Sequence, residues 1–359
     1  MILIDRFNTK HLAFVLMGTT IVSLKTYPTV FTRSGGRDTW IAFIISSVVI
    51  FFYAWFMFSS FKKTNCYNLH KIYCGAAGKY LGNFFIILYG LTLFLTLLES
   101  ASVEANSMHT NMLLETPTWY IVLFFVFPAI YTVKKGRAAI MIATIISMIL
   151  VTLSGINLAI LTSKYKHFNY LLPILRNGVT PGLIKSFFQS IGLYGCLSIS
   201  FPYLEDLDNK KNLVKHELLV MLFIIQIEIV AIVGITVTFD IRYLNTMSYP
   251  KLLQTQLVDL AHFLESGEFF VMLQILGGWY IKYVLTFYAL MKILHYIKLH
   301  DKYVIYTTSL LVLIGALSLS NNLFNLFKYL NYFSYICLFN FVIVPFFMML
   351  IFRIRKKTA

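Results

Sequence analysis

Residues 10–28, KHLAFVLMGTTIVSLKTYP, and residues 181–202, PGLIKSFFQSIGLYGCLSISFP, decide the fold, because each is an apolar run that contains helix-weakening residues. In the first run Gly18 is followed by two threonines, in the second Gly192 lies near the middle, and each run ends on a proline. Such residues are tolerated in membrane helices where the freed backbone groups line a cavity or find side-chain partners. Both runs therefore predict helices that are interrupted inside a membrane.

The composition of the whole chain is that of a membrane protein. Of its 359 residues, 58% are hydrophobic and 13% are charged, whereas a soluble domain is about 25% charged. This balance argues against a soluble enzyme, a nucleic-acid-binding domain and a disordered chain. The net charge of +15 does not indicate a nucleic-acid partner, because the lysines and arginines lie in short breaks between apolar runs.

The apolar runs predict an all-α polytopic membrane protein with about ten transmembrane helices. A helical span needs about 20 mostly apolar residues. The ten candidates are residues 11–31, 39–61, 80–106, 118–133, 137–162, 182–203, 213–240, 267–291, 303–320 and 332–352. With the N-terminus placed inside, 19 lysines and arginines fall in the inner segments and 8 in the outer loops. This asymmetry predicts that both termini lie on the cytoplasmic side.

The two interrupted spans are the first members of two five-helix halves, residues 11–162 and 182–352, of one integral membrane domain. Broken helices in corresponding positions of two halves are typical of inverted-repeat transporters, and they mark the binding site. We expect backbone amides at Gly18, Thr19 and Thr20 to hold a carboxylate, because half-helix N-termini favour anions. The facing wall is predicted to contain Ser190, Gly192 and Tyr194. Glycines that only allow close helix packing are the alternative explanation.

Glu99, Glu104 and Glu228 are acidic residues within predicted spans, where ionisable groups are costly and often functional. Glu99 and Glu104 lie in the outer part of the third span, and Glu228 lies in the middle of the seventh. We predict that they belong to a polar pathway or act as charge partners. The alternative for Glu99 and Glu104 is a wet helix end, and for Glu228 it is a silent pair with a neighbouring helix.

Lys25 and Lys282 also lie within predicted spans. Lys282 lies well inside the eighth span, on one face with Trp279 and Thr286, so it needs a buried partner that the sequence does not identify. We predict Thr286 as a further polar contact to the ligand. Lys25 lies one turn beyond the first predicted break, and we expect it to extend to the outer interface.

The remaining features predict no catalytic chemistry. No phosphate-binding loop, nucleophile elbow or zinc-protease motif is present, so the sequence predicts no enzyme, no cofactor and no metal. Cys66, His70 and Cys74 lie on one helical face, which we interpret as a buried interfacial face rather than a metal site. The outer connection 241–266 predicts a short interfacial helix, which either covers a vestibule or has no gating role.

At this point the residues resemble a family: the B subunits of spore germinant receptors, the GerAB/GerKB-like spore germination permeases of the amino acid–polyamine–organocation superfamily. The shared marks extend over essentially the whole chain. They are Gly18-Thr19-Thr20, Glu104 with Leu114-Glu115-Thr116-Pro117, residues 169–175 (NYLLPIL) with Gly178, residues 201–204 (FPYL), and residues 249–265 followed by Glu268, Trp279 and Lys282.

The resemblance implies a LeuT-like fold of two inverted five-helix repeats in the inner membrane of a bacterial endospore. It also implies an A-type membrane subunit and a C-type lipoprotein as partners, and a small germinant such as an amino acid as ligand. Many members carry a Gly-Glu pair in the broken part of span six, where this chain has Gly192-Leu193. The germinant therefore differs, or Glu104 supplies the charge.

Three functions fit the sequence. The first is a germinant-sensing subunit that signals to partner subunits, and the second is a proton- or sodium-coupled amino-acid transporter. The third is a scaffold or ion-conducting subunit that binds no germinant. A shared fold does not decide between them.

Overall fold

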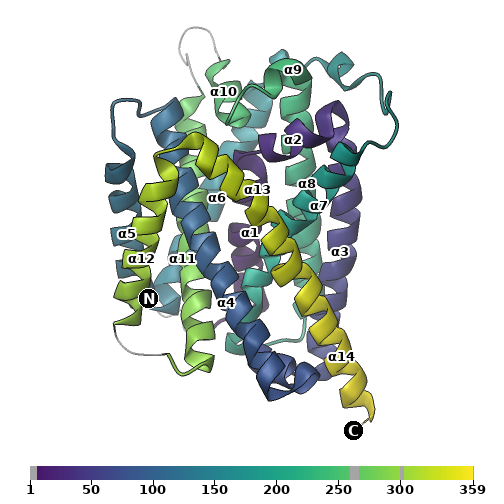
Figure 1. Cartoon of the computed structure of the whole chain (residues 1–359), viewed down its shortest axis with the longest axis vertical. Coiled ribbons are helices and arrows are strands. Elements are labelled where there is room, and N and C mark those ends of the chain that lie inside the picture. Colours follow the sequence, from purple (N-terminus) through teal and green to yellow (C-terminus); the bar gives the residue numbers. More distant parts are fainter. Residues whose placement is uncertain (1–5, 259–266, 300–302, 359) are drawn as a thin grey trace.

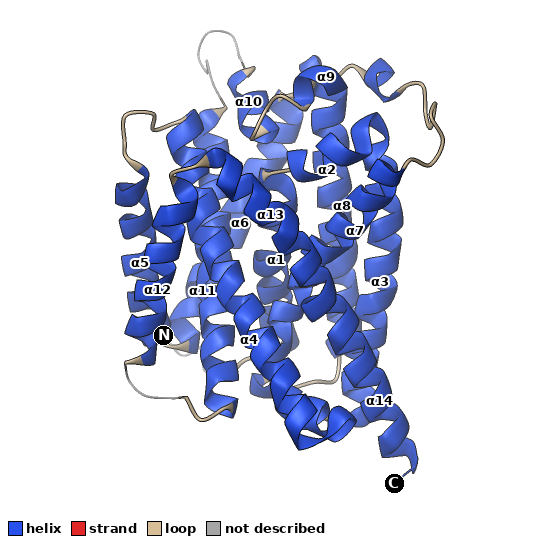
Figure 2. Cartoon of the chain, viewed as in Figure 1, coloured by secondary structure: helices blue, strands red, loops and turns tan. Residues whose placement is uncertain are grey.

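A computed structural model describes residues 6–258, 267–299 and 303–358 of the chain. The described residues form a bundle of helices joined by short loops (Figures 1 and 2). In chain order the elements are α1 (Thr9–Thr26), α2 (Thr29–Gly35), η1 (Gly36–Asp38), α3 (Thr39–Thr64), α4 (Leu69–Asn111), α5 (Thr118–Lys134), α6 (Arg137–Leu161), η2 (Ser163–Tyr165), η3 (Phe168–Leu171), α7 (Pro181–Tyr194), η4 (Gly195–Asp206), α8 (Leu213–Thr238), α9 (Ile241–Leu244), α10 (Pro250–Gln256), α11 (Glu268–Tyr296), α12 (Val304–Ser320), α13 (Leu323–Cys337), η5 (Leu338–Ile343) and α14 (Val344–Thr358).

The helices confirm a membrane protein. Six helical segments in the described part of the chain are long and apolar enough to cross a bilayer, and two shorter apolar helices, α5 and α12, accompany them. The six segments are Thr29–Thr64, Leu69–Asn111, Arg137–Leu161, Leu213–Thr238, Glu268–Tyr296 and Leu323–Lys356. Each of the ten predicted spans lies on helix, and the two that correspond neither to the six long segments nor to the two shorter helices, 11–31 and 182–203, are those predicted to be interrupted.

Large apolar side chains cover the outside of the bundle. Phe52, Phe124 and Leu153, from α3, α5 and α6, are each more than half exposed. A soluble monomer rarely exposes a continuous apolar surface of this kind, whereas lipid solvates it. The polar side chains of the spans point inward instead, so the groups that can pair charges or bind a ligand lie in the interior of the bundle.

The first predicted break is displaced along the chain. Helix α1 is continuous through Gly18, Thr19 and Thr20, and it ends at Thr26, where Pro28 follows and α2 begins. The hydroxyls of Thr19 and Thr20 donate to carbonyls one turn earlier, at 3.0 Å to Val15 and 2.8 Å to Leu16. Such back-bonding keeps a threonine within a helix. The expectation of exposed amides at residues 18–20 is therefore wrong.

Close packing accounts for the glycine in α1. A Cβ at Gly18 would lie 2.9 Å from side-chain atoms of both Ile281 and Leu285 on α11. The missing side chain lets α1 approach α11, which is the alternative that the sequence left open.

The second predicted break is confirmed. Helix α7 ends at Tyr194, and Gly195 begins η4, a 3₁₀ segment of 12 residues that contains Pro202. Because 3₁₀ runs longer than three or four residues are uncommon, this is a strongly irregular segment. Gly192 packs on α13, since a Cβ there would lie 1.9 Å from the carbonyl oxygen of Ser334.

Helix α1 lies at the centre of the bundle, where it packs against α6, α8, α11 and η4 (Figure 1). At one end of the bundle the chain near Asn8 pairs with Asn209, and Lys62 donates to the carbonyl of Lys211 at 3.1 Å. At the other end α2, α9 and α10 lie together (Figure 1). The interfacial helix predicted in the connection 241–266 corresponds to α10, and residues 259–266 of this connection lie outside the described residues.

Candidate functional site

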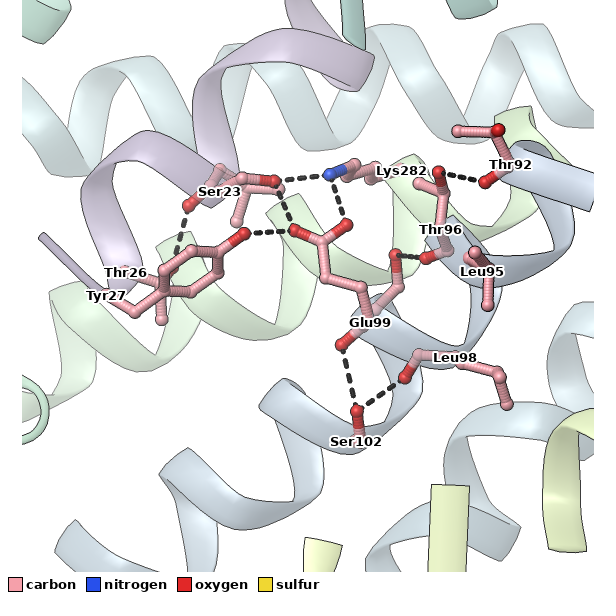
Figure 3. Close-up of polar contacts among 12 residues, drawn as sticks. Ser23, Thr26, Tyr27, Thr92, Leu95, Thr96, Leu98, Glu99, Ser102 and Lys282 are labelled. Carbon is pink, nitrogen blue, oxygen red and sulfur yellow. Dashed lines mark hydrogen bonds and ion pairs between the residues drawn. The ribbon is translucent and has the colours of Figure 1, made fainter. Parts of the chain in front are cut away.

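A buried ion pair joins three helices at the end of α1. The Lys282 Nζ of α11 lies 2.6 Å from Oε2 of Glu99 on α4, and both side chains are fully buried. Ser23 donates to Oε1 of Glu99 at 2.7 Å. Tyr27 also donates to this oxygen, and Lys282 donates to the hydroxyl of Ser23 (Figure 3). The carboxylate thus accepts from three side chains, and α1 is fixed to both other helices.

The local sequence explains this arrangement. Ser23 and Tyr27 are four residues apart across the last turn of α1, so both face the same neighbouring helices. Tyr27 stacks on Trp279 at a ring separation of 6.2 Å, and the ammonium of Lys282 lies 5.3 Å from the same indole. A buried charge is costly unless it is paired and hydrogen-bonded, and this network meets both conditions.

The network resolves two sequence predictions. The partner of Lys282, which the sequence could not identify, is Glu99, and the interpretation of Glu99 as a wet helix end is wrong. Thr286 lies one turn along α11, and it is buried with no partner for its hydroxyl in the part of the chain that the structure describes. The sequence analysis missed Ser23 and Tyr27, although their spacing just before Pro28 is a signal that could have found them.

A cavity of two lobes lies beside the ion pair, bordered by α1, α6, α8, α10 and α11. The smaller lobe has a volume of about 30 Å³ and is lined by Gly18 and Thr26 among others. The larger lobe has a volume of about 270 Å³, near the lower limit of small-molecule sites, about 300 Å³. Residues that line both lobes are Ile21, Lys25, Val151, Lys251 and Gln274.

The cavity concentrates positive charge. Lys25 lines both lobes, so the expectation that it extends to the outer interface is wrong. Lys166, which follows α6, and Lys251, on α10, line the larger lobe with it. Lys251 donates to Oε1 of Gln254 at 2.8 Å. Burial, together with the nearby ammonium groups of Lys25 and Lys166, lowers the pKa of Lys251 to about 7.

The predicted facing wall lies elsewhere. Ser190 donates to Ser46 at 2.9 Å, and the hydroxyl of Tyr194 lies 3.0 Å from that of Ser47, so both hold α7 against α3. The lobes are lined neither by these residues nor by Gly192, Thr19 or Thr20. Of the predicted ligand-binding residues, Gly18 alone borders this cavity, and the roles of the others stay predictions.

Buried carboxylates without hydrogen-bond partners form a third feature. In the described part of the chain, both oxygens of Glu104 and Glu228 have no partner, and each side chain is at most 1% exposed. Glu228 lies within electrostatic reach of Lys25. The sequence analysis missed Glu217, which has the same properties. It precedes Glu228 by three helical turns of α8 and shares its face.

Comparisons with known proteins agree with this architecture. The model of the spore permease family, described as spore germination protein, matches residues 7–324. Spore germination protein XB of Bacillus anthracis is 23% identical over 293 residues, which cover 81% of this chain and 81% of that protein. The chain belongs to the spore germination permease family, a family of non-enzymatic membrane proteins.

Proposed function

We propose that this chain is the germinant-sensing B-type subunit of a spore germination receptor. It would lie in the inner membrane of the spore with both termini on the core side, and it would act with an A-type membrane subunit and a C-type lipoprotein. Family membership supports this role. The gathering of Lys62, Lys211 and Lys356 at the end of the bundle that contains Asn8 supports the orientation.

The proposed fold is a LeuT-like pair of inverted repeats, residues 11–162 and 182–352, within one membrane domain. Its support is the pair of irregular segments in corresponding positions, the α1–α2 junction and the α7–η4 junction. Both α1 and η4 pack in the interior, where a transporter of this type binds its substrate.

The observation that carries the proposal is the contact between the cavity and the buried ion pair. Lys25 and Thr26 of the last turn of α1 line the cavity, and Ser23 and Tyr27 of the same segment hold Glu99. A ligand biases a two-state protein only through differential affinity for the two states. A small molecule such as an amino acid in this cavity would stabilise one position of α1, and the network would couple that position to α4 and α11.

The first test is germination of spores that lack this gene, measured as dipicolinate release across a panel of single amino acids. We expect loss of the response to one or a few of them, and recovery with the wild-type gene. An unchanged response to every germinant would contradict the receptor role.

A second test concerns the site. Gly18→Leu would place a side chain against Ile281 and Leu285 of α11 at the border of the smaller lobe, and we expect it to abolish the response at a normal protein level. The matched control is Gly90→Leu, because Gly90 also packs its helix against α11 and lines neither lobe. A normal dose response in Gly18→Leu spores, or equal loss in both variants, would contradict the site. Thr19, Thr20, Ser190, Gly192, Tyr194 and Thr286 remain predicted contacts, to be tested by the same assay.

A second candidate function is proton- or sodium-coupled amino-acid transport. The unpaired carboxylates Glu104, Glu217 and Glu228 favour it, because buried acidic groups in membrane proteins often serve as proton relays. Counterflow of labelled amino acid in proteoliposomes distinguishes the two functions. Concentrative uptake that Glu228→Gln abolishes would favour transport, and its absence would favour sensing alone.

A further inference from the structure

The larger lobe of the cavity contains hydrogen-bond donors whose capacity is not met by protein acceptors. The Nε2 of Gln274 has no hydrogen-bond partner among the described residues, although that side chain is only 8% exposed. A Cβ at Gly155 on α6 would lie 3.8 Å from this nitrogen, which places the amide next to α6 at the wall of the lobe. The same lobe is also lined by three ammonium groups, those of Lys25, Lys166 and Lys251.

The charges of the lobe are unbalanced. Lys25 comes from α1, Lys166 from the segment after α6 and Lys251 from α10, whereas Glu228 of α8 is the one carboxylate near Lys25 among the described residues. Lys166 donates to the carbonyl of Ala159 at 3.2 Å, and Lys251 donates to the amide oxygen of Gln254, so within residues 6–258, 267–299 and 303–358 both ammonium groups donate to neutral oxygens. Burial of like charges is unfavourable until an anion compensates them.

The backbone amides that were expected to hold an anion are not available. Residues Gly18, Thr19 and Thr20 lie within the continuous helix α1, where amides donate to carbonyls of the preceding turn. A carboxylate that enters this cavity therefore meets side-chain donors rather than a helix N-terminus.

We propose that the larger lobe binds the anionic group of the sensed ligand, a carboxylate or a phosphate, between Lys25, Lys166, Lys251 and Gln274. This inference rests on the proposed ligand-sensing function, but it concerns the chemistry of the ligand. A neutral or purely cationic molecule would leave the excess positive charge in place.

The lobe opens sideways between α6 and α8, where Ile156, Phe223 and Val230 line it and are exposed. The anion can therefore arrive either dissolved or as the headgroup of a membrane lipid. Both sources share the chemistry proposed here, and the experiment separates them.

Binding is expected to weaken as the pH rises. With a pKa of about 7, Lys251 is mainly cationic at pH 6 and mainly neutral at pH 8.5. The groups that face it are Lys25, Lys166 and Gln274, with Glu228 next to Lys25. Loss of one of the three cations reduces the attraction for an anion.

The experiment measures thermal unfolding of the purified full chain in phosphatidylcholine nanodiscs, titrated with sodium acetate, sodium phosphate, L-alanine and L-alaninamide at constant ionic strength. L-alaninamide is the matched probe that lacks the carboxylate. We expect stabilisation by at least one anionic probe and none by L-alaninamide. Lys251→Gln and Lys25→Gln should each weaken the apparent affinity by about tenfold, the value of one charge-assisted hydrogen bond.

Two further variants keep the test decisive. Gly234→Leu should block binding without disturbing the fold, because no atom lies within 4 Å of a Cβ there and the lobe provides the space. Lys185→Gln is the control, because Lys185 is exposed on α7 and does not line the lobe. Nanodiscs that contain phosphatidylglycerol test whether the anion is a lipid headgroup. Stabilisation of wild type by this lipid, lost in Lys251→Gln, would indicate that source.

The outcomes separate this inference from the proposed function. Equal stabilisation of wild type, Lys251→Gln and Gly234→Leu, or no effect of any anionic probe or lipid, would overturn the anion site. Anion binding that depends on the lysines would support it even if spores lacking the gene germinate normally, a result that would refute the sensing role alone.

Discussion

Two groups of lysines lie within one helical bundle, and they differ in what surrounds them. Lys282 contacts a carboxylate at 2.6 Å and a serine, and no part of it is exposed. Lys25 and Lys251 line a cavity in which neutral groups and other cations are the nearest neighbours of Lys251. The first arrangement is complete without a ligand, and the second is not.

The comparison teaches how structural and functional charges can be separated in a membrane protein. A satisfied pair fixes helix positions, whereas an unsatisfied group adjacent to space is available to a ligand. The network at Glu99 therefore stabilises the fold and couples its helices, and the cavity at Lys25 is where binding is expected.

The largest effect should come from breaking the satisfied pair. Glu99→Gln leaves the ammonium of Lys282 buried without a counter-charge, which costs about 3–5 kcal/mol. We expect the thermal midpoint of the purified protein, or its level in spores, to fall sharply. The exposed Glu115→Gln is the control, and the double variant Glu99→Gln with Lys282→Met should recover part of the loss. Equal stability of Glu99→Gln and wild type would contradict the structural role of the pair.

Tyr27→Phe removes one donor to the same carboxylate while it keeps the stack on Trp279. A hydrogen bond to a charged group is worth about 1.5–3 kcal/mol, so the unfolding free energy should fall by that amount. Tyr131→Phe, at a tyrosine that is 65% exposed, should change it little. If both variants behave alike, the hydroxyl of Tyr27 does not contribute to the network.

The cavity should give the protein a pH-dependent stability without ligand. The pKa of Lys251 is lowered to about 7 in the folded state from an ordinary value of 10.5, so the unfolded state binds more protons between these values. Stability therefore rises with pH over that window, opposite in sign to the expected pH dependence of anion binding. The measurement is the thermal midpoint from pH 7 to pH 9.5, and Lys251→Gln should flatten the rise. The prediction would be contradicted if the thermal midpoint of wild type fell with rising pH and Lys251→Gln showed the same pH dependence.

The smallest loss of stability should come from Lys251→Met at pH 8 without ligand. The lysine is mainly neutral in the folded state and protonated in the unfolded state at this pH, so the variant removes a cost of deprotonation and should not lower the unfolding free energy. Lys282→Met, measured in parallel, leaves Glu99 unpaired and should lower it. Similar losses in both variants would erase the distinction between the two groups of lysines.

The sequence predicted the helical class, the ten helical regions and the family, because these depend on composition, apolar length and motif order. It also identified Glu99 and Lys282 separately. It placed the first interruption at Gly18-Thr19-Thr20, where the hydroxyls back-bond within α1. The pattern could not show this, because a glycine that breaks a helix and a glycine that packs a helix have the same local sequence.

What the sequence determined by itself is local: which segments are apolar enough for lipid, where prolines end helices, and which ionisable residues lie within spans. Only the tertiary structure decided that Lys282 contacts Glu99, 183 residues away, and that Lys25 faces a cavity shared with Lys251 rather than the outer interface. The physical reason is that burial and pairing of a charge depend on side chains from other helices, and no spacing along one chain segment specifies which helices become neighbours.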